Sequence, residues 1–548
     1  GIFEGFIPNL KKGTVYKYGI VSAHGEFLEK GDPYARSWEI PPRTASIVWQ
    51  DNYKWKDHAW MGIRKDKNSL DAPMSVYELH FSSWKTHEDG SALTYKEMAK
   101  VLPAYMNEMG FTHVEFMPMM EYPYSGSWGY QLCGYFAPTS RFGSPEDLKY
   151  LIDVLHQEQI GVILDWVPSH YPGDAHGLYR FDGSHLYEHA DPKQGYHPDW
   201  SSYIFNYGRH EVRNFLLSNA HYWFENFHID GMRVDAVASM LYLDYSRKDG
   251  EWIPNVYGGN ENLEAIQFLK ELNETLYADF PDIQTIAEES TSFPMVSRPV
   301  DLGGLGFGLK WMMGWMNDTL GYFKRECIYR SYHQNNITFS LTYAFTENFM
   351  LPLSHDEVAH GKGSLLAKMP GDEWQRFANL RLLYGYMFSH PGSKLLFMGS
   401  EWGQNGEWKY EQSLDWHELE KPFHRGVKEL VKALNKMYSS EPALYSANYT
   451  ANGFEWIDFS DHDNAVISYL RKGTDSEMIL TACNFTPEPR KNYLIGVPEG
   501  KWELILHTDE DRFGGSNYEV IETIDSEPIS AHNQKSSIVI NLPPLASI

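Results

Sequence analysis

The sequence is poor in cysteine. Its 548 residues include three cysteines, Cys133, Cys327 and Cys483, and no two of them have CxxC spacing. An odd and sparse set of this kind excludes a disulfide framework and is typical of a protein from a reducing compartment. We therefore expect a cytoplasmic protein.

Long apolar runs are also absent. No run approaches the roughly eighteen consecutive apolar residues that a membrane helix requires. The first residues, GIFEGFIPNLKKGT, contain no basic segment followed by an apolar stretch, so we expect no signal peptide there. Residue 1 is Gly rather than Met, which indicates a trimmed or processed chain.

Basic residues are the third deficit. The chain has 47 Lys and Arg against 73 Asp and Glu, which gives a formal net charge of −26. Binding to nucleic acid or to an anionic membrane surface needs a basic face, so neither is an expected partner. The negative net charge is compatible with an uncharged ligand. Aromatic residues make up 15% of the chain, which suits stacking on ligands, although core packing accounts for most such residues.

The pattern of apolar and turn residues changes twice along the sequence, which predicts three domains of an α/β protein. Residues 1–72 show short strand patterns and turns, typical of a β module. Residues 73–446 alternate apolar strands with helices, which predicts a parallel sheet and, with eight units, a (β/α)₈ TIM barrel with an insertion at 168–209. Residues 447–548 read as antiparallel strands, so we expect a C-terminal β-sandwich.

The individual elements follow from apolar periodicity and punctuation. A capping box is expected at Ser144-Pro145-Glu146-Asp147. In the N-terminal module, strands are expected at 5–8 and 14–20. Barrel strands are predicted at 75–80, 112–117, 162–167, 232–237, 285–289, 306–311, 350–354 and 395–398. Helices are predicted at 95–109, after Ser144, and around 210–228, 262–279, 373–388 and 426–438. Strands of the sandwich are predicted at 465–471, 478–484, 502–506 and 537–542.

Acidic residues mark the ends of four predicted barrel strands, where the active site of such a barrel forms. These ends carry Asp165 with His170, Arg233 with Asp235, Glu288, and His355 with Asp356. Any one acidic residue here could be a helix cap or a loop hydrogen-bonding residue. The occurrence of four such ends on one rim favours an enzyme.

The spacing of Arg233 and Asp235 has a chemical interpretation. Residues two apart on a strand point the same way, and a guanidinium beside a carboxylate keeps it ionised, as a nucleophile requires. Glu288 on the next strand could then lie about 5–5.5 Å away, the carboxylate separation of retaining glycosidases. Glu289 should point away. A structural ion pair between Arg233 and Asp235 remains the alternative.

Two other motifs resemble cofactor sites and fail on inspection. The segment HDEVAH at 355–360 lacks the Glu that follows the first His of HExxH, and its histidines are five apart. The segment GGLGFG at 303–308 is not GxGxxG and does not lead cleanly into a helix. We therefore expect no metal and no cofactor.

Several motifs resemble a known family. DWVPSH at 165–170, GMRVDAV at 231–237, AEEST at 287–291 and LSHDEV at 353–358 resemble, in order, the four sequence regions of the α-amylase superfamily, glycoside hydrolase family 13. Within it, the chain is similar over nearly its whole length to the 1,4-α-glucan (glycogen) branching enzyme family. This likeness is carried by the segments 126–131, 182–200, 244–266, 303–320, 394–404 and 484–493.

The resemblance implies a role for each site residue. Asp235 matches the catalytic nucleophile, Glu288 the general acid/base and Asp356 the third carboxylate. The residues that match the substrate-binding positions around the reacting glucose are Tyr130, Asp165, His170, Arg233 and His355. Residues 1–72 resemble the later part of a family-48 carbohydrate-binding module, and the end LPPLASI stops short of its relatives. Ser169 replaces the Asn that binds calcium in many amylases, so we expect no calcium site.

The implied function is a glycosyltransferase that cleaves α-1,4-glucan chains and re-attaches the segment through an α-1,6 bond, by retaining double displacement. The expected substrates are glycogen, amylose and malto-oligosaccharides, and a monomer is expected. The alternative is an α-1,4-glucan hydrolase of the amylase type, because the same carboxylates serve both reactions. A non-catalytic glucan-binding protein on this fold would be expected to lack one of the three carboxylates.

Overall fold

The computed structural model describes residues 4–475 and 477–548. By its internal contacts the chain divides into two compact units. The first comprises residues 1–65, 86–104 and 115–307, and the second residues 66–85, 105–114 and 308–548. In the part of the chain that the structure describes, no helix is long and apolar enough to cross a membrane.

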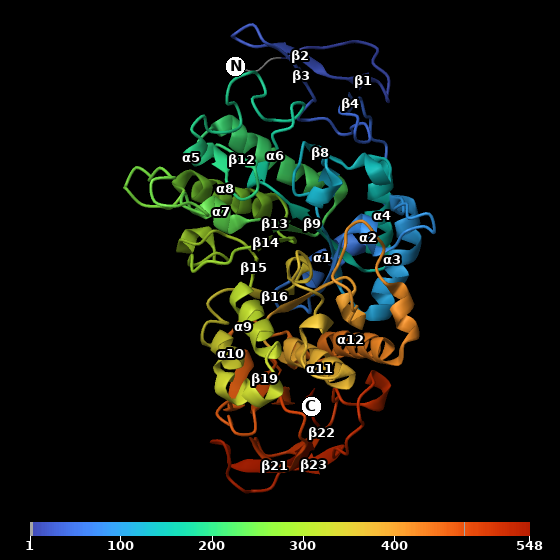
Figure 1. Ribbon diagram of the computed structural model, residues 1–548, viewed down its shortest axis with the longest axis vertical. Helices are drawn as coiled ribbons and strands as arrows, with labels where there is room; N and C mark the ends of the chain where they lie inside the picture. The colour runs from blue at the N-terminus through green and yellow to red at the C-terminus, as the bar shows by residue number, and fades with distance from the viewer. Residues whose placement is uncertain (1–3, 476) are drawn as a thin grey trace. The chain divides into compact units, whose positions relative to one another are not determined.

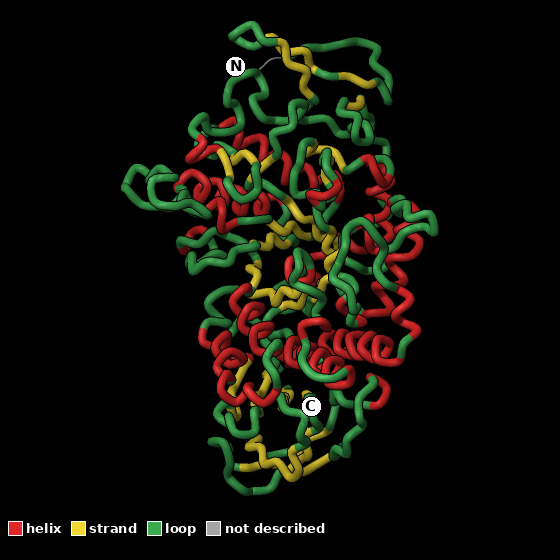
Figure 2. The backbone as a smooth tube through the Cα atoms, viewed as in Figure 1, coloured by secondary structure: helices red, strands yellow, loops and turns green. Residues whose placement is uncertain are grey.

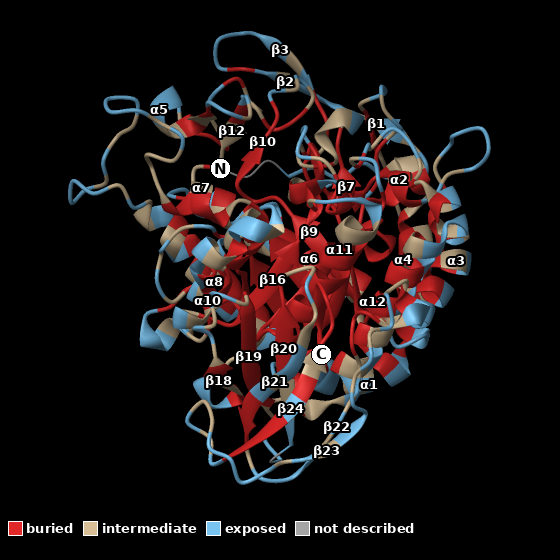
Figure 3. Ribbon diagram, turned by 60° about the horizontal axis from the view of Figure 1, so that its bottom comes forward, coloured by how far each residue is buried: buried red, intermediate tan, exposed pale blue. Residues whose placement is uncertain are grey.

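Eight parallel strands form a closed barrel in the order β13-β14-β15-β16-β17-β5-β6-β9. Every residue of these strands is buried, as Figure 3 shows for β9 and β16. Burial on both faces is characteristic of a parallel sheet covered by helices. The predicted barrel is therefore confirmed. The strands are β5 (Ser75–Leu79), β6 (His113–Phe116), β9 (Gly161–Trp166), β13 (Gly231–Val234), β14 (Gln284–Ala287), β15 (Leu309–Trp311), β16 (Phe349–Leu353) and β17 (Ser393–Phe397).

One helix of the first unit begins where the sequence predicted a capping box. Helix α4 (Pro145–Gln157) begins at the predicted capping box, in which the Ser144 side chain accepts from the Asp147 backbone and Asp147 accepts from Ser144. The other helices here are α5 (Pro192–Gly195), α6 (His210–Phe227), α7 (Val237–Leu241) and α8 (Leu263–Asp279); α3 (Tyr95–Met109) has its predicted bounds. A short hairpin joins β7 (Met120–Glu121) to β8 (Gly134–Pro138).

The insertion at 168–209 contains a small antiparallel sheet. Its strands β10 (His170–Tyr171), β11 (Tyr196–His197) and β12 (Ser202–Ile204) lie in the order β10-β12-β11. A short turn, residues 198–201, connects β11 to β12. This sheet positions residues of the candidate site.

The N-terminal module agrees with the prediction only in part. Strand β1 (Val15–Tyr16) pairs with β4 (Ser46–Ile47), and β2 (Tyr18–Val21) pairs with β3 (Phe27–Lys30). The strand predicted at 5–8 was wrong, because these residues form coil and a turn. Helix α1 (His58–Lys67) was not predicted, since its sequence HAWMGIRKDK buries just Trp60 and Arg64 and shows no apolar stripe.

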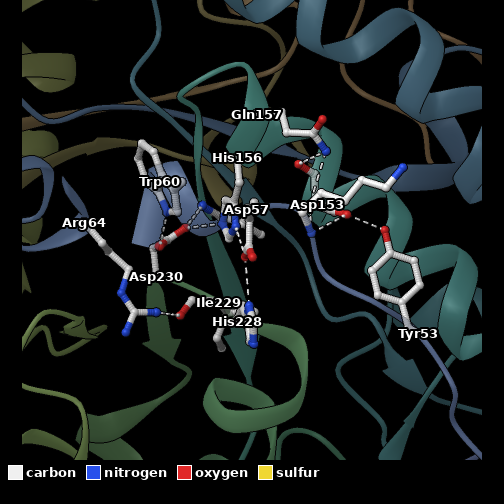
Figure 4. A network of polar contacts seen from close by, with 12 residues as sticks. Tyr53, Asp57, Trp60, Arg64, Asp153, His156, Gln157, His228, Ile229 and Asp230 are labelled. Carbon is white, nitrogen blue, oxygen red and sulfur yellow. Dashed lines mark hydrogen bonds and ion pairs between the residues drawn. The ribbon is translucent and has the colours of Figure 1, made fainter. Parts of the chain in front are cut away.

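A buried polar network connects α4 with β13 and the segment before α1 (Figure 4). His156 Nδ1 lies 3.0 Å from Asp57 Oδ2, and His156 Nε2 lies 2.9 Å from Asp230 Oδ2. His228 Nδ1 lies 2.8 Å from Asp57, and Trp60 Nε1 donates to Asp230 at 2.8 Å. Burial lowers the pKa of His156, but the two carboxylates outweigh it and raise the pKa to about 9. A charged imidazole therefore links two carboxylates from distant parts of the unit.

In the second unit, α11 (Glu373–Ser389) and α12 (Pro422–Ser440) lie side by side (Figure 1). Helix α11 begins with a capping box between Asp372 and Gln375 and is buried along most of its length. The remaining helices of this unit are α2 (Phe81–Trp84), α9 (Met313–Phe323) and α10 (Asn335–Thr338).

The residues after α12 form strands joined by loops (Figure 2). One antiparallel sheet has the order β18-β19-β20-β25, and β21 pairs with β24. Apolar side chains of β19, β21 and β24, such as Leu470, Ile495 and Ile538, share one core, which confirms the predicted β-sandwich. The boundaries at 72 and 446 stay predictions. The strands are β18 (Phe454–Asp458), β19 (Val466–Lys472), β20 (Met478–Asn484), β21 (Arg490–Val497), β22 (Lys501–Glu503), β23 (Thr523–Asp525), β24 (Ser536–Leu542) and β25 (Ala546–Ser547).

Candidate active site

The candidate site of the first unit is built around the guanidinium of Arg233. Arg233 lies on β13 directly opposite Asp165 of β9. Its Nη1 lies 2.7 Å from both carboxylate oxygens of Asp165 and 2.8 Å from Asp235 Oδ1. The Arg233 side chain is 1% exposed. The contact with Asp235 confirms that residues 233 and 235 point the same way.

Asp235 and Glu288 follow neighbouring strands. Strand β13 ends at Val234, so Asp235 lies just beyond it, and its backbone N–H donates to Trp166 O at 2.9 Å. Glu288 follows β14, and its Oε2 lies 3.0 Å from Arg233 Nη2. The backbone N–H of Ala236, whose φ is +54°, donates to the same Oε2 at 2.7 Å. One guanidinium and one tight backbone turn therefore bind both carboxylates.

Tyr130 completes this group. Its hydroxyl donates to Asp165 Oδ2 at 2.6 Å, and Arg233 Nη1 lies 3.4 Å from the same hydroxyl oxygen. Burial lowers the pKa of Arg233, but Asp165, Tyr130, Glu288 and Asp235 outweigh it, and the pKa is raised well above its usual value. The guanidinium therefore stays charged and offsets part of the acidic charge around it.

His170 lies next to this group on β10. Ser169 Oγ is 2.8 Å from His170 Nδ1, and the ring also hydrogen-bonds the backbone of Tyr130. Burial lowers the pKa of His170 to about 3, and the nearby His197 adds to the effect. His170 is therefore neutral at physiological pH and can exchange hydrogen bonds with an uncharged ligand.

His355 and Asp356 belong to the second unit, in a 3₁₀ helix that follows β16. The His355 backbone N–H donates to Glu78 Oε2 at 2.9 Å, and its Nδ1 contacts Glu78 Oε1. His355 Nε2 lies 3.5 Å from Asp356 Oδ1. The buried Glu78 of β5 thus orients His355, whereas the Asp356 side chain is 39% exposed and accessible to a ligand.

Of the eight site residues expected from the sequence, the structure joins five in one hydrogen-bonded cluster: Tyr130, Asp165, Arg233, Asp235 and Glu288. His170 adjoins the cluster through the backbone of Tyr130. His355 and Asp356 form a pair in the other unit. The neighbouring Glu289 is buried, and its carboxylate accepts from the Thr291 backbone N–H at 2.8 Å.

Sequence reasoning missed Glu78. The signal that could have found it is an acidic residue in the middle of SVYEL, a strand whose other side chains predict complete burial. A buried carboxylate needs a partner, and here the partner is His355. Among the residues that the structure describes, no group of three or more His, Cys, Asp or Glu could hold a metal ion.

The barrel and the acidic cluster at its strand ends are typical of TIM-barrel enzymes that act on glycosidic bonds. The α-amylase catalytic domain family matches residues 99–202 and 199–467, and the α-amylase C-terminal all-β domain family matches residues 456–548. A putative α-amylase from Salmonella typhimurium has the same fold, with a TM-score of 0.71 at 18% identity over 98% of this chain and 91% of its own.

Curated relatives are much more similar. The 1,4-alpha-glucan branching enzyme GlgB of Aquifex aeolicus is 58% identical over 552 residues, which cover all of this chain and 87% of the relative. The enzyme of the same name from Aromatoleum aromaticum is 56% identical over 547 residues, covering all of this chain and 86% of the relative. The chain therefore belongs to the 1,4-α-glucan branching enzyme family, within the α-amylase family, as its motifs predicted.

Proposed function

We propose that the protein cleaves α-1,4-glucan chains and re-attaches the released segment through an α-1,6 bond, as the name of its relatives implies. The observation that carries the proposal is the binding of two carboxylates from adjacent strand ends, Asp235 and Glu288, by one buried guanidinium. Retaining glycosidases use such a pair of carboxylates, one as the nucleophile and the other as the acid/base.

In the first half-reaction, Asp235 is the nucleophile. Its contact with Arg233 favours the ionised form that attacks the anomeric carbon. Glu288 donates its proton to the departing O4, so the C1–O4 bond breaks while a bond from C1 to Asp235 forms. The backbone N–H of Ala236 and the Arg233 guanidinium hold Oε2 of Glu288 in place.

In the second half-reaction, the Glu288 carboxylate accepts the proton of a glucose 6-hydroxyl on an acceptor chain. The 6-oxygen attacks C1 and displaces Asp235, so an α-1,6 bond forms and the configuration at C1 is retained after two inversions. Glu288 then carries a proton again and is ready for the next cleavage. If water replaces the acceptor hydroxyl, the same steps give hydrolysis.

Asp356 and His355 are proposed to bind hydroxyls of the reacting glucose, together with Tyr130, Asp165 and His170. The support is topological: β16 belongs to the same parallel barrel as β13 and β14, and the carboxyl ends of such strands carry the active site. The contact of Glu78 Oε1 with His355 Nδ1 fixes the His355 ring, which would otherwise rotate. We also propose that the protein acts as a monomer in the cytoplasm, where its three free cysteines stay reduced.

The test follows two products of one reaction. The protein is incubated with amylose while the iodine complex and the reducing ends are measured in parallel, and the product is then treated with isoamylase. We expect iodine absorbance to fall with little increase in reducing ends, and isoamylase to release short chains. Reducing ends that rise in step with the loss of colour would show the amylase-type hydrolase instead.

A further inference from the structure

Three aromatic rings, two stacked and one tilted, lie beside the candidate site, and we refer to them as the aromatic platform: His197, Trp200 and Tyr245. His197 ends β11, and Trp200 lies in the turn between β11 and β12. Their rings are stacked at a centroid distance of 3.7 Å and an interplanar angle of 7°. The Tyr245 ring lies 5.7 Å from His197 and 6.1 Å from Trp200.

His197 contributes a flat face rather than polar chemistry. It is 3% exposed, and among the residues that the structure describes neither of its ring nitrogens has a hydrogen-bond partner. Burial lowers its pKa to about 4, so the ring is neutral near pH 7. Burying an imidazole without hydrogen bonds is costly, and what this ring provides in return is support for the indole of Trp200.

The platform adjoins the residues that bind the reacting glucose. The Trp200 ring lies 5.0 Å from the His170 ring, and the Gln131 side-chain amide donates to Trp200 O at 3.5 Å. Tyr245 is within the electrostatic reach of Glu288 and Asp235, whose charges add to the effect of burial and raise its pKa. Trp200 and Tyr245 are both partly exposed. The platform therefore extends from the site toward solvent.

We propose that Trp200 and Tyr245, supported by His197, bind the glucose units of the donor chain that adjoin the glucose attached to Asp235. This inference rests on the proposed function. The flat face of a glucose ring presents C–H groups, which pack on aromatic rings while its hydroxyls stay hydrated. The donor chain is the expected occupant because its reacting glucose is proposed to bind at His170 and Tyr130, and the platform contacts His170 and Gln131, the neighbour of Tyr130.

A binding site for remote units changes the reaction in a characteristic way. Units that do not react bind equally in the ground state and in the transition state, so the loss of their contacts raises KM and is felt most with long donors. For Trp200→Ala we expect KM for amylose to rise about tenfold, with a smaller change in kcat. We also expect the lengths of transferred chains, measured after isoamylase, to shift toward a broader distribution.

Matched variants separate stacking from folding. Trp200→Phe keeps a ring and should retain most of the wild-type affinity. His197→Phe also keeps a ring and should behave as the wild type. His197→Ala removes the support of the indole and should resemble Trp200→Ala. Tyr332→Ala removes an 82% exposed ring of the second unit and should change nothing. Melting temperatures of all variants identify any that unfold.

A direct measurement of binding tests the platform independently of the reaction that the protein catalyses. Affinity for maltoheptaose is measured calorimetrically in an Asp235→Asn background with and without Trp200→Ala. A loss of affinity of about tenfold supports the platform even if the wild type proves to be a hydrolase. Unchanged affinity together with an unchanged distribution of chain lengths would overturn the inference.

Discussion

Arg233 is the residue on which the candidate site depends, because it contacts three carboxylates at once. Asp165, Asp235 and Glu288 all lie within 3.0 Å of its two terminal nitrogens. Removing one partner of a buried ionic group leaves uncompensated charge and costs far more than the pair contributes. The spacing of Arg233 and Asp235 was predictable from the sequence alone. The approach of Glu288 to the same guanidinium depends on two strands that are distant in sequence.

Arg233→Lys should impair both activity and stability. A lysine carries the charge but offers a single point of contact, so it cannot bind Asp235 and Glu288 through separate nitrogens. We expect kcat to fall by about 10²-fold or more and the melting temperature to drop by several degrees. Steady-state branching assays and thermal unfolding measure the two effects. Kinetics close to those of the wild type would contradict the role given to the guanidinium.

Asp235→Asn should abolish turnover while the fold is kept. An amide cannot serve as the nucleophile, and losses on removing a nucleophile reach several orders of magnitude. We expect kcat to fall by at least about 10³-fold, while the contacts of Arg233 with Asp165 and Glu288 keep the protein folded. Asp89→Asn is the control, because Asp89 lies in an exposed loop and accepts hydrogen bonds from Ser91. A variant at 235 with substantial activity would exclude Asp235 as the nucleophile.

At the scale of elements, local signals and distant pairings differ in how far they can be predicted. The first residue of helix α4 was predicted correctly because the capping box lies within four consecutive residues of the sequence. The all-buried barrel strands were found from their apolar runs. The contact of His156 with Asp57 and Asp230 could not be found, because 99 and 74 residues separate the partners. Nor could the platform, since His197, Trp200 and Tyr245 meet only in the folded chain.

The His156 network should make stability depend on pH. The pKa of His156 is raised to about 9 from 6.5, so its stabilising effect is fully present below about pH 6.5 and is lost as pH rises through 9. The shift corresponds to about 3 kcal/mol. Burial raises the pKa of Asp57, but its two histidine partners lower it overall, so the same network also weakens as pH falls below the usual range for Asp.

The measurement is unfolding free energy against pH for the wild type and His156→Gln. We expect the difference between them to be largest just below about pH 6.5 and to shrink by up to about 3 kcal/mol as pH rises through 9. His221→Gln is the matched control, since His221 is 31% exposed and pairs with Asp279 at the surface. Parallel curves for wild type and His156→Gln would show that the buried imidazole is not charged.

At the scale of the whole molecule, the net charge of −26 fits an uncharged polymer as the ligand. From the sequence, most aromatic residues were expected to pack in the core. In the structure Trp166, Trp223 and Trp315 are fully buried, whereas Trp200 is partly exposed at the site. Fold class and family were predictable from the sequence because the four motif regions lie at the ends of barrel strands β9, β13, β14 and β16. Which aromatic rings face the ligand required the fold.

Binding to a neutral glucan should depend little on salt. No counterions are released when an uncharged chain binds, in contrast to binding of a polyanion. We expect KM for amylose to change by less than about twofold between low and high sodium chloride, and no retention of the protein on heparin at low salt. A steep loss of affinity with salt would indicate that charged groups on the ligand are recognised.

The most direct test of the account is to trap the covalent intermediate. Glu288→Gln removes the acid/base and slows release of the glycosyl group, so an activated donor such as maltosyl fluoride should accumulate on the protein. The account predicts that mass spectrometry of the digested protein finds one maltosyl adduct, on the peptide that contains Asp235 and at its carboxylate. An adduct at another residue, or turnover of the fluoride with inversion and no adduct, would contradict it.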